Sequence, residues 1–337
     1  MKAVVLVGGE GTRLRPITDT VPKPLVPLVD RPILDHVLDH LARHEVREVV
    51  LSSSYLEHEF RTYRRMGAPT ITWITETEPL GTGGAIVNAL ESLESDEPFF
   101  ALNGDILTDL DLTAMLATHR ERRAIATIAL THVDDARPFG LVPTGSDGRV
   151  IEFREKPAEP MPGDINAGTY VLEPSALGPW ESGRNVSIER EIFPALIAGR
   201  QPVHGFTSGA YWIDLGTHEL YLRASFDLLD GKIHGRPEYP APFVADGADV
   251  SPDATVGRHV VVGPRASVAG GARVEDSVLH RGAGVGPGAV VRGSVLGPDS
   301  TVDGEAIDSV VGEGASVPRG SALISARIPP DESATSG

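Results

Sequence analysis

The sequence predicts an α/β domain with a mixed, mostly parallel sheet, followed by a second domain built as a parallel β-helix. Two observations lead to this prediction. Short apolar runs alternate with longer helical patterns up to about residue 232, and a six-residue repeat of aliphatic side chains begins near residue 243. Alternating strands and helices fold into a sheet with helices on both faces, which is a Rossmann-like arrangement. At 337 residues the chain is long enough for two cores.

The first part of the chain contains four predicted buried strands, at 2–7, 47–54, 70–74 and 98–105. Three helices are predicted within 30–44, 81–93 and 187–199; in the first of them, Ile33, Val37, Leu38 and Leu41 share one apolar face. Ligands of such a sheet bind at the carboxyl ends of its strands. Polar residues that directly follow a strand are therefore the candidates for a site.

The second part of the chain has aliphatic residues at a fixed spacing of six, beginning with Val250, Val256, Val262, Val268 and Val274. Glycine and proline fill the gaps, and "DSVL", "GSVLG" and "DSVVG" recur at 276, 293 and 308. A disordered linker would not keep its valines in register, so we predict hexapeptide coils that bury their aliphatic side chains against one another. The expected division is a first domain at 1–235, a β-helix of about five coils at 243–325, and a disordered tail at 326–337.

The composition excludes several classes of function. The formal net charge is −17, whereas a nucleic-acid-binding protein needs a basic face, so we expect no nucleic-acid partner. No apolar run approaches the roughly 18 residues of a membrane span, so we expect no membrane association. The chain has no cysteine, which excludes disulfides, thiolate metal sites and cysteine nucleophiles. These features predict a cytoplasmic protein.

A glycine-rich segment, "GGEGTRLRPITDTVPKP", follows the first predicted strand and runs from residue 8 to residue 24. Glycines in this position let backbone N–H groups approach a phosphate. The segment is not a P-loop, and Leu14 stands where a dinucleotide fingerprint needs its third glycine. An ordinary turn would need neither Arg13 nor Lys23, so the two cations indicate an anion pocket in an acidic chain. Lys23 is one of only four lysines, and its compact ammonium suits a crowded site.

The pattern G-G-x-G-T-R-L-x-P-x-T followed by P-K-P resembles the signature of the sugar-nucleotide pyrophosphorylases, also called nucleotidyltransferases. The resemblance continues through "EPLGTGGA" (78–85), "LNGDIL" (102–107), "FGLV" (139–142), "EKP" (155–157), "INAGTYVL" (165–172), "SIEREIFPAL" (187–196) and "YWIDLGTHELYLRAS" (211–225). It is most similar to the mannose-1-phosphate guanylyltransferase branch, which combines these segments with a C-terminal left-handed β-helix.

The resemblance implies nucleotidyl transfer, in which a sugar 1-phosphate attacks the α-phosphorus of a nucleoside triphosphate and releases pyrophosphate. The nucleophile is already an anion, so the chemistry needs positioning and charge stabilisation rather than a general base. By resemblance, Arg13 would hold the β- and γ-phosphates, and Lys23 would lie between the α-phosphate and the sugar phosphate. Arg15 is interpreted equally well as a surface residue.

The resemblance also implies three sets of contacts. Nucleotide contacts are expected from Leu6, Gly8, Gly9, Gly11, Thr12, Glu76, Gly81 and Thr82. Sugar-phosphate contacts are expected from Gly140, Glu155, Lys156, Asn166, Gly168 and Glu189. Asp105 and Asp214 each end an apolar strand and are the expected ligands of Mg²⁺. Glu76 is preferred over Glu78 as the acceptor for the guanine edge, with a solvated loop glutamate as the alternative. Ser187 is alternatively a helix cap, Glu189 a surface residue, and His218 has no evident role.

Three other functions remain open at this stage. The first keeps the fold but makes the chain a uridylyl-, thymidylyl- or cytidylyltransferase for glucose 1-phosphate. The second adds an acyltransferase in the β-helix, with His259 or His280 as its base. The third is a non-catalytic regulatory subunit, which is less consistent with the presence of Arg13, Lys23 and both aspartates. The aliphatic flank of the β-helix predicts a homo-oligomer.

Overall fold

The computed structural model covers residues 1–337 and describes residues 1–53, 60, 63–94 and 96–334. The chain divides into two compact units, and both are discontinuous in sequence. The first unit comprises 1–9 and 37–212, and the second comprises 10–36 and 213–337. The glycine-rich segment therefore begins in the first unit and continues in the second unit after Gly9. A single boundary in the sequence cannot describe this division. No helix among the described residues is long and apolar enough to cross a membrane.

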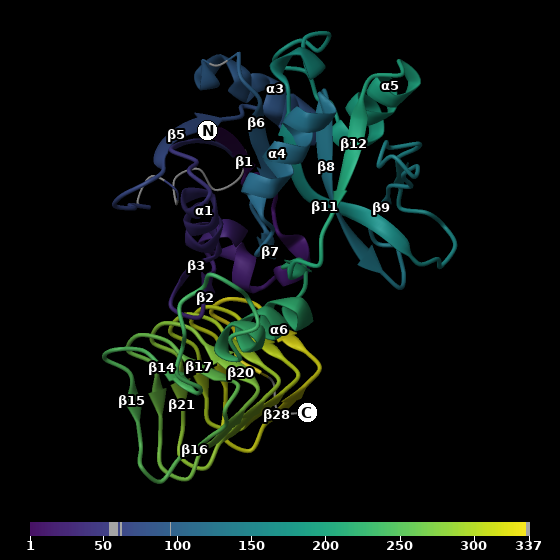
Figure 1. The fold of residues 1–337 in the computed structure, drawn as a ribbon. Coiled ribbons are helices and arrows are strands. Elements are labelled where there is room, and N and C mark those ends of the chain that lie inside the picture. Colours follow the sequence, from purple (N-terminus) through teal and green to yellow (C-terminus); the bar gives the residue numbers. More distant parts are fainter. Residues whose placement is uncertain (54–59, 61–62, 95, 335–337) are drawn as a thin grey trace. The chain divides into compact units, whose positions relative to one another are not determined.

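The first unit is built on a nine-stranded sheet (Figure 1). Its strands are β1 (Lys2–Leu6), β4 (Glu48–Ser53), β5 (Thr70–Thr75), β6 (Phe99–Asn103), β8 (Ala126–Val133), β9 (Gly140–Leu141), β10 (Arg154–Glu155), β11 (Gly163–Leu172) and β12 (Val203–Thr207). The order is β10-β9-β11-β6-β1-β4-β5, with β8 beside β11 and β12 beside β8. β1 is parallel to both β4 and β6, and β11 runs antiparallel to β6. The predicted mixed α/β sheet is confirmed; Ser54, at the end of one predicted strand, lies outside the described residues.

The helices of the first unit cover this sheet and close its core. They are α3 (Gly81–Leu93), α4 (Leu112–Arg122) and α5 (Phe193–Ala198), while α1 (Ile33–Arg43) crosses from the second unit into the first. Buried side chains such as Val4, Ile86, Phe99 and Phe193 share one apolar cluster. The helix predicted at 187–199 begins as a π-turn, η5 (Ile188–Ile192), before α5. Pro194 has no N–H to donate into a regular helix, which accounts for an irregular turn ahead of it.

The second unit contains the β-helix, whose coils run from green to yellow in Figure 1. The first of its three sheets contains β14 (Phe243–Val244), β17 (Val260–Val262), β20 (Ser277–Leu279), β23 (Val295–Leu296), β26 (Val310–Val311) and β29 (Arg327–Ile328). The second contains β15 (Asp249–Val250), β18 (Ser267–Val268), β21 (Gly284–Val285), β24 (Thr301–Val302) and β27 (Ser316–Val317). The third contains β16 (Thr255–Val256), β19 (Arg273–Glu275), β22 (Val290–Arg292), β25 (Glu305–Ile307) and β28 (Ala322–Ile324).

The register of the β-helix confirms the repeat seen in the sequence. Val250 pairs with Val268 of the next coil, and Val256 pairs with Val274 in the neighbouring sheet. Every pair is parallel, and the aliphatic side chains form one continuous core, as a left-handed β-helix requires. The segment expected to be a tail contributes β29, and Ala334 packs against this core. Residues 335–337 lie outside the described part.

The recurring "DSVL", "GSVLG" and "DSVVG" segments form one corner of the coils. The backbone N–H of Ser294 donates to Ser277 Oγ at 3.1 Å, and that of Ser309 donates to Ser294 Oγ at 3.0 Å. The residue before each serine has a positive φ: 45° at Asp276, 58° at Gly293 and 48° at Asp308. Glycine and aspartate tolerate this conformation. The repeat therefore encodes a turn residue followed by a serine ladder.

The second unit also contains the segment 10–36 and a long helix, α6 (His218–Leu229). The segment is made of three short 3₁₀ turns, η1 (Thr12–Leu14), η2 (Ile17–Asp19) and η3 (Lys23–Leu25), and a small ribbon, β2 (Pro27–Leu28) with β3 (Arg31–Pro32). The side chain of Thr217 caps α6 by accepting the N–H of Leu220. Two shorter strands remain: β7 (Ile106–Thr108) directly follows the predicted strand at 98–105, and β13 (Trp212–Asp214) ends at Asp214.

Candidate active site

The segment 10–36 is folded tightly around Gly11. Gly11 has a φ of 60°, and a Cβ atom there would lie 3.0 Å from Thr18 Cγ2 and 3.3 Å from Lys23 Cβ. Its carbonyl accepts the hydroxyl of Thr18 at 2.8 Å and the N–H of Leu14 at 2.8 Å. The glycine is therefore required both by its backbone conformation and by the close approach of Lys23.

Asp214 lies between the two cations of this segment. Its Oδ2 is 3.7 Å from an Arg13 Nη2, and its Oδ1 is 3.8 Å from Lys23 Nζ. Lys23 is 8% exposed, whereas the Arg13 side chain is 64% exposed. A Cβ atom on Gly216 would lie 2.5 Å from Arg13 Nη2, so this glycine leaves room for the guanidinium. The structure therefore brings Arg13, Lys23 and Asp214 into one charged cluster.

Three histidines of the second unit are hydrogen-bonded, directly or through a tyrosine, to carbonyl oxygens of the segment 10–36. His218 Nε2 lies 3.0 Å from Leu14 O, and His36 Nε2 lies 2.9 Å from Leu28 O. The third, His280, reaches Pro27 O through the Tyr221 hydroxyl. Because a carbonyl only accepts, the ring nitrogens of His218 and His36 must carry the proton. His218 had no evident role in the sequence, and this shared role of the three histidines was not predicted.

Burial lowers the pKa of each of these histidines. Desolvation lowers the pKa of His36 to about 4 and that of His280 to about 4. It also lowers the pKa of His218, with the Arg327 guanidinium as a further cause. The three rings are therefore neutral near pH 7, and each has a single N–H to donate.

In the first unit, the turn after β6 packs against the end of β1. The N–H of Gly104 donates to Leu6 O at 2.9 Å, and a Cβ atom on Gly104 would lie 2.9 Å from that oxygen. Asp105 follows this turn and is half-buried. Asn103, on the other side, lies beside Gly168, where a Cβ atom would be 2.7 Å from Asn103 Nδ2. The glycines at 104 and 168 thus let this strand end pack closely.

Glu76 is held by its own surroundings at the end of β5. Ser52 Oγ donates to Glu76 Oε1 at 2.8 Å, and the N–H of Leu80 donates to Glu76 Oε2 at 3.0 Å. The glutamate is half-buried, whereas Glu78 is exposed. A carboxylate oxygen can accept more than one hydrogen bond, so Glu76 retains acceptor capacity in a fixed orientation.

The start of α3 and the π-turn η5 meet at Glu189. Thr82 Oγ1 donates to Glu189 Oε2 at 2.6 Å, and Ser187 Oγ donates to the same oxygen at 2.8 Å. Gly81 has a φ of 69°, and a Cβ atom there would lie 2.7 Å from Val186 O. Ser187 also caps the turn by accepting the N–H of Arg190. The expected nucleotide residue Thr82 and the expected sugar residue Glu189 are thus in direct contact.

Tyr170 joins Glu189 to Asn166. Asn166 Nδ2 donates to the Tyr170 hydroxyl at 2.8 Å, and the hydroxyl is also hydrogen-bonded to Glu189. Burial, followed by the Glu189 charge, raises the pKa of Tyr170, so the phenol stays protonated. Sequence reasoning missed Tyr170, although it lies within the quoted "INAGTY" segment; the only available signal was its spacing of four from Asn166.

Three more of the residues expected to contact the sugar phosphate lie on β9, on β10 and directly after β10. Gly140 pairs with Glu155, and a Cβ atom on Gly140 would lie 2.7 Å from Phe153 Cε1. Lys156 has a φ of 50°, and its ammonium is 3.8 Å from Glu155 Oε1. The Lys156 side chain is 60% exposed, so its ammonium is accessible to an anion.

The predicted metal site is not tested by this arrangement. Asp105 belongs to the first unit and Asp214 to the second, so their convergence on one ion stays a prediction. Within the described residues, no group of three or more His, Asp or Glu side chains could hold a metal ion. Arg15, for which a surface role was the alternative, pairs with Glu10 at 3.1 Å and Asp19 at 3.1 Å.

Comparison with protein families matches both parts of the chain. Residues 2–231 match the model described as "Nucleotidyl transferase", and residues 239–336 match the "GMPPB C-terminal domain". Among curated proteins, the chain is 41% identical to a mannose-1-phosphate guanylyltransferase of Mycobacterium tuberculosis, over 86% of this chain and 82% of that one. It is 36% identical to mannose-1-phosphate guanylyltransferase 1 of Arabidopsis thaliana, over 90% and 87% of the two chains.

Solved structures show the same likeness. HddC from Yersinia pseudotuberculosis, complexed with GMP-PN, is 30% identical and superposes with a TM-score of 0.57, covering 66% of this chain and 97% of that one. A putative glucose-1-phosphate thymidylyltransferase from Bacillus anthracis superposes with a TM-score of 0.59 at 22% identity, covering 67% of this chain and 94% of that one, which shows the fold alone.

Proposed function

The chain belongs to the nucleotidyl transferase family, and we propose that it transfers a guanylyl group from GTP to mannose 1-phosphate, giving GDP-mannose and pyrophosphate. The observation that carries this proposal is the cluster of Arg13, Lys23 and Asp214 on the glycine-rich segment. The identity to curated mannose-1-phosphate guanylyltransferases over most of both chains supports the choice of substrates.

In this reaction the sugar phosphate attacks the α-phosphorus of GTP, and pyrophosphate leaves in line. Lys23 balances the two phosphates that meet at the α-phosphorus, because its ammonium is a compact charge in a buried position. Arg13 is exposed and has a planar fork that suits the terminal phosphates, whose negative charge grows as pyrophosphate departs. Asp214 keeps both cations in place before the phosphates arrive.

Asp105 and Asp214 would hold a divalent metal ion, with Mg²⁺ as our choice. The fit rests on donor chemistry: both are partly buried carboxylates, and Mg²⁺ takes one or two carboxylates together with substrate phosphates and water. When bound, the ion neutralises phosphate charge and orients the phosphates.

The base and the sugar are recognised by residues of the first unit. Glu76 would accept from the N1–H and N2–H₂ donors of guanine, with Gly81 and Thr82 close to the nucleotide. Glu155, Asn166 and Glu189 would contact sugar hydroxyls, and Lys156 would balance the sugar phosphate. Leu6, Gly8, Gly9, Gly11 and Thr12 would contribute nucleotide contacts, while Gly140 and Gly168 leave room for the sugar.

An acyltransferase in the β-helix finds no support among its histidines. His280 is 3% exposed and hydrogen-bonded to Tyr221, while His259 lies 3.1 Å from Asp230 and 3.5 Å from Asp276. Both histidines make contacts within the second unit, and no observation favours this alternative. The β-helix is instead proposed to support a homo-oligomer, and light scattering that showed only monomer at micromolar concentration would contradict this.

The test is pyrophosphate release with Mg²⁺ over a matrix of four nucleoside triphosphates and the 1-phosphates of mannose, glucose, galactose and N-acetylglucosamine. We expect GTP with mannose 1-phosphate to dominate and Asp105→Asn to abolish the signal. A dominant UTP or dTTP signal would keep the mechanism but overturn the role given to Glu76. No signal from folded protein would favour a regulatory subunit.

A further inference from the structure

Helix α6 contacts the segment 10–36 on one side and the β-helix on the other. Tyr221, in the first turn of the helix, is 2% exposed. Its hydroxyl is hydrogen-bonded to Pro27 O, and it also lies 3.0 Å from His280 Nε2. Pro27 lies in β2, and His280 directly follows β20 of the β-helix. One phenol therefore connects the β-helix to the segment that carries Arg13 and Lys23.

The direction of these hydrogen bonds is fixed by the groups involved. Pro27 O is a carbonyl and only accepts, so the Tyr221 O–H donates its single proton to it. The phenolic oxygen must then accept from His280, which places the ring proton on Nε2. Removing either side chain leaves a buried polar group without its partner, which costs more than the hydrogen bond itself contributes.

The two carbonyls held by α6 flank the phosphate-handling residues. Leu14, bound by His218, directly follows Arg13, and Pro27 lies four residues after Lys23. The turn between Lys23 and Pro27 is closed by the Val26 N–H, which donates to Lys23 O at 3.1 Å. A displacement of Pro27 is therefore passed to Lys23 through a short, hydrogen-bonded stretch.

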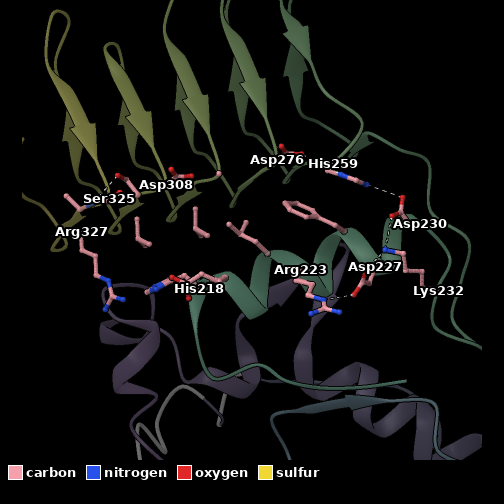
Figure 2. Close-up of a pocket in the computed structure, with 18 residues that line it drawn as sticks. His218, Arg223, Asp227, Asp230, Lys232, His259, Asp276, Asp308, Ser325 and Arg327 are labelled. Atoms are coloured by element: carbon pink, nitrogen blue, oxygen red, sulfur yellow. Dashed lines mark hydrogen bonds and ion pairs between the residues drawn. The ribbon is translucent and has the colours of Figure 1, made fainter. Parts of the chain in front are cut away.

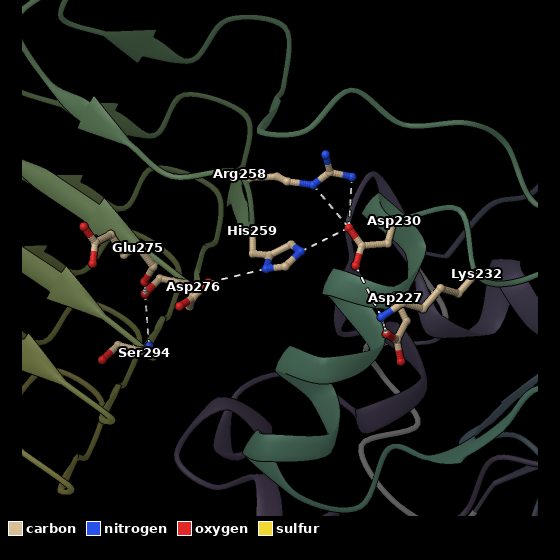
Figure 3. A network of polar contacts seen from close by, with 9 residues as sticks. Asp227, Asp230, Lys232, Arg258, His259, Glu275, Asp276 and Ser294 are labelled. Atoms are coloured by element: carbon tan, nitrogen blue, oxygen red, sulfur yellow. Dashed lines mark hydrogen bonds and ion pairs between the residues drawn. The ribbon is translucent and has the colours of Figure 1, made fainter.

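The far end of α6 is fixed to the β-helix by a separate polar network (Figure 3). Asp230 Oδ1 lies 3.1 Å from Arg258 Nη2 and 3.1 Å from His259 Nε2, and its Oδ2 lies 3.3 Å from Lys232 Nζ. These contacts fix the position of the helix, but none of them reaches the segment 10–36. They provide a natural control for contacts that do.

A groove of about 630 Å³ lies between α6 and the β-helix (Figure 2). Apolar side chains, including Leu222, Phe226 and Val295, line it. Within this groove the Phe226 ring stacks on His259 with ring centroids 5.0 Å apart, so α6 is held to the β-helix by contacts besides those of Asp230.

We propose that His280 is a positioning residue for the reaction, acting through Tyr221 on the segment that carries Arg13 and Lys23. The β-helix thus holds the phosphate-handling segment in its working geometry. The proposal rests on the function proposed above for the identity of the substrates, but not for the contacts themselves.

The test compares Tyr221→Phe, His280→Leu and His280→Gln in the full chain, with Asp230→Asn as the control. At a temperature well below the lowest melting point, Tyr221→Phe and His280→Leu are expected to lower kcat about tenfold, because small displacements of phosphate-binding groups slow the chemistry. The KM for mannose 1-phosphate should stay within about twofold, since most of its expected contacts are elsewhere. Glutamine retains an N–H donor, so His280→Gln should recover kcat to within about twofold of the wild type.

The control separates positioning from stability. Asp230→Asn is expected to lower the melting temperature without changing kcat or either KM. The proposal is overturned if Tyr221→Phe and His280→Leu lower only the melting temperature, or if His280→Gln is as slow as His280→Leu. If His280→Leu does not fold, Tyr221→Phe and His280→Gln decide alone.

The outcome can be told apart from failure of the proposed function. If the wild type forms no GDP-mannose, the substrate assignment fails, and pyrophosphate binding by calorimetry then tests the positioning. Tyr221→Phe should bind inorganic pyrophosphate several-fold more weakly than the wild type, while Asp230→Asn should bind it equally. Equal binding by Tyr221→Phe and the wild type would overturn the proposal.

Discussion

Two regions hold their polar groups in different ways: the phosphate-handling segment, residues 10–36, and the sugar-side cluster of Thr82, Ser187 and Glu189. In the segment 10–36, Asp214 faces Arg13 and Lys23 across 3.7 and 3.8 Å, and Arg13 is mostly exposed. Around Glu189, by contrast, hydroxyl groups donate at 2.6 and 2.8 Å. Long ion pairs can be exchanged for phosphate oxygens, whereas short hydrogen bonds fix an acceptor in advance. The difference agrees with the proposed function, in which one region binds and releases phosphate charge and the other recognises sugar hydroxyls.

The largest expected effect comes from removing the buried cation. Lys23→Met should lower kcat about a thousandfold, because it removes a fixed charge from the position where the transition state needs it. Lys23→Arg should recover little activity, because the buried position accommodates a lysine side chain and the guanidinium of arginine is broader. Steady-state pyrophosphate release measures both, with Lys2→Met as a matched control; activity in Lys23→Met close to that of the control would contradict the role.

Acid should weaken the phosphate-handling segment more than the sugar-side cluster. His36 and His280 have folded pKa values of about 4, below the unfolded value of about 6.5. The unfolded chain therefore binds more protons, so the stability that each neutral ring contributes is fully present above pH ~6.5 and is lost as pH falls to about 4. The loss is up to about 3 kcal/mol per histidine.

Denaturant unfolding between pH 7.5 and 4.5 measures this effect. In His280→Gln, the decrease in unfolding free energy over this range should be smaller than in the wild type, because one protonation has been removed. Equal pH slopes for the two proteins would show that His280 does not contribute as described.

Asp214→Asn tests the charged cluster that Asp214 forms with Arg13 and Lys23. The substitution removes the carboxylate that faces both cations and is expected to bind the metal, so kcat should fall about a hundredfold. The required Mg²⁺ concentration should rise as well. A titration of rate against Mg²⁺ checks this, and an unchanged Mg²⁺ dependence would remove Asp214 from the metal site.

Thr82→Val tests the hydrogen bonds around Glu189 and has the smallest expected effect. The isosteric change removes the donor to Glu189, so the KM for mannose 1-phosphate should rise by about tenfold at most. The KM for GTP should rise as well, because Thr82 is also proposed to lie close to the nucleotide. Measuring both KM values decides the matter. An unchanged KM for mannose 1-phosphate would mean that the hydrogen bond from Thr82 does not position Glu189 for the sugar.

The regular parts of the fold were predictable because their residue patterns are local. The valine register fixed the β-helix, and the "DSV" repeats occupy one corner of it, although the serine ladder there was not anticipated. The boundary between the units was not predictable in this form. The assignment of the segment 10–36 to the unit that contains the β-helix depends on contacts such as that between His218 and Leu14, which are 204 residues apart.

The candidate site was predictable in its residue types but not in its pairings. Arg13, Lys23 and Asp214 were singled out individually, and the structure adds that they form one cluster. Tyr221 gave no signal, because a buried tyrosine in a helix pattern looks like any other core residue, and Tyr170 gave only its spacing of four from Asn166. The partners of Tyr221 and the Glu189 partner of Tyr170 come from distant segments, and no local pattern encodes them.

The proposed reaction is tested by the identity of its product. Purified protein incubated with GTP, mannose 1-phosphate and Mg²⁺ is expected to form GDP-mannose, identified by mass spectrometry, in equal amounts with pyrophosphate, and the Lys23→Met variant should form almost none over the same time. Absence of GDP-mannose from the folded wild type, or an equal yield from Lys23→Met, would contradict the account.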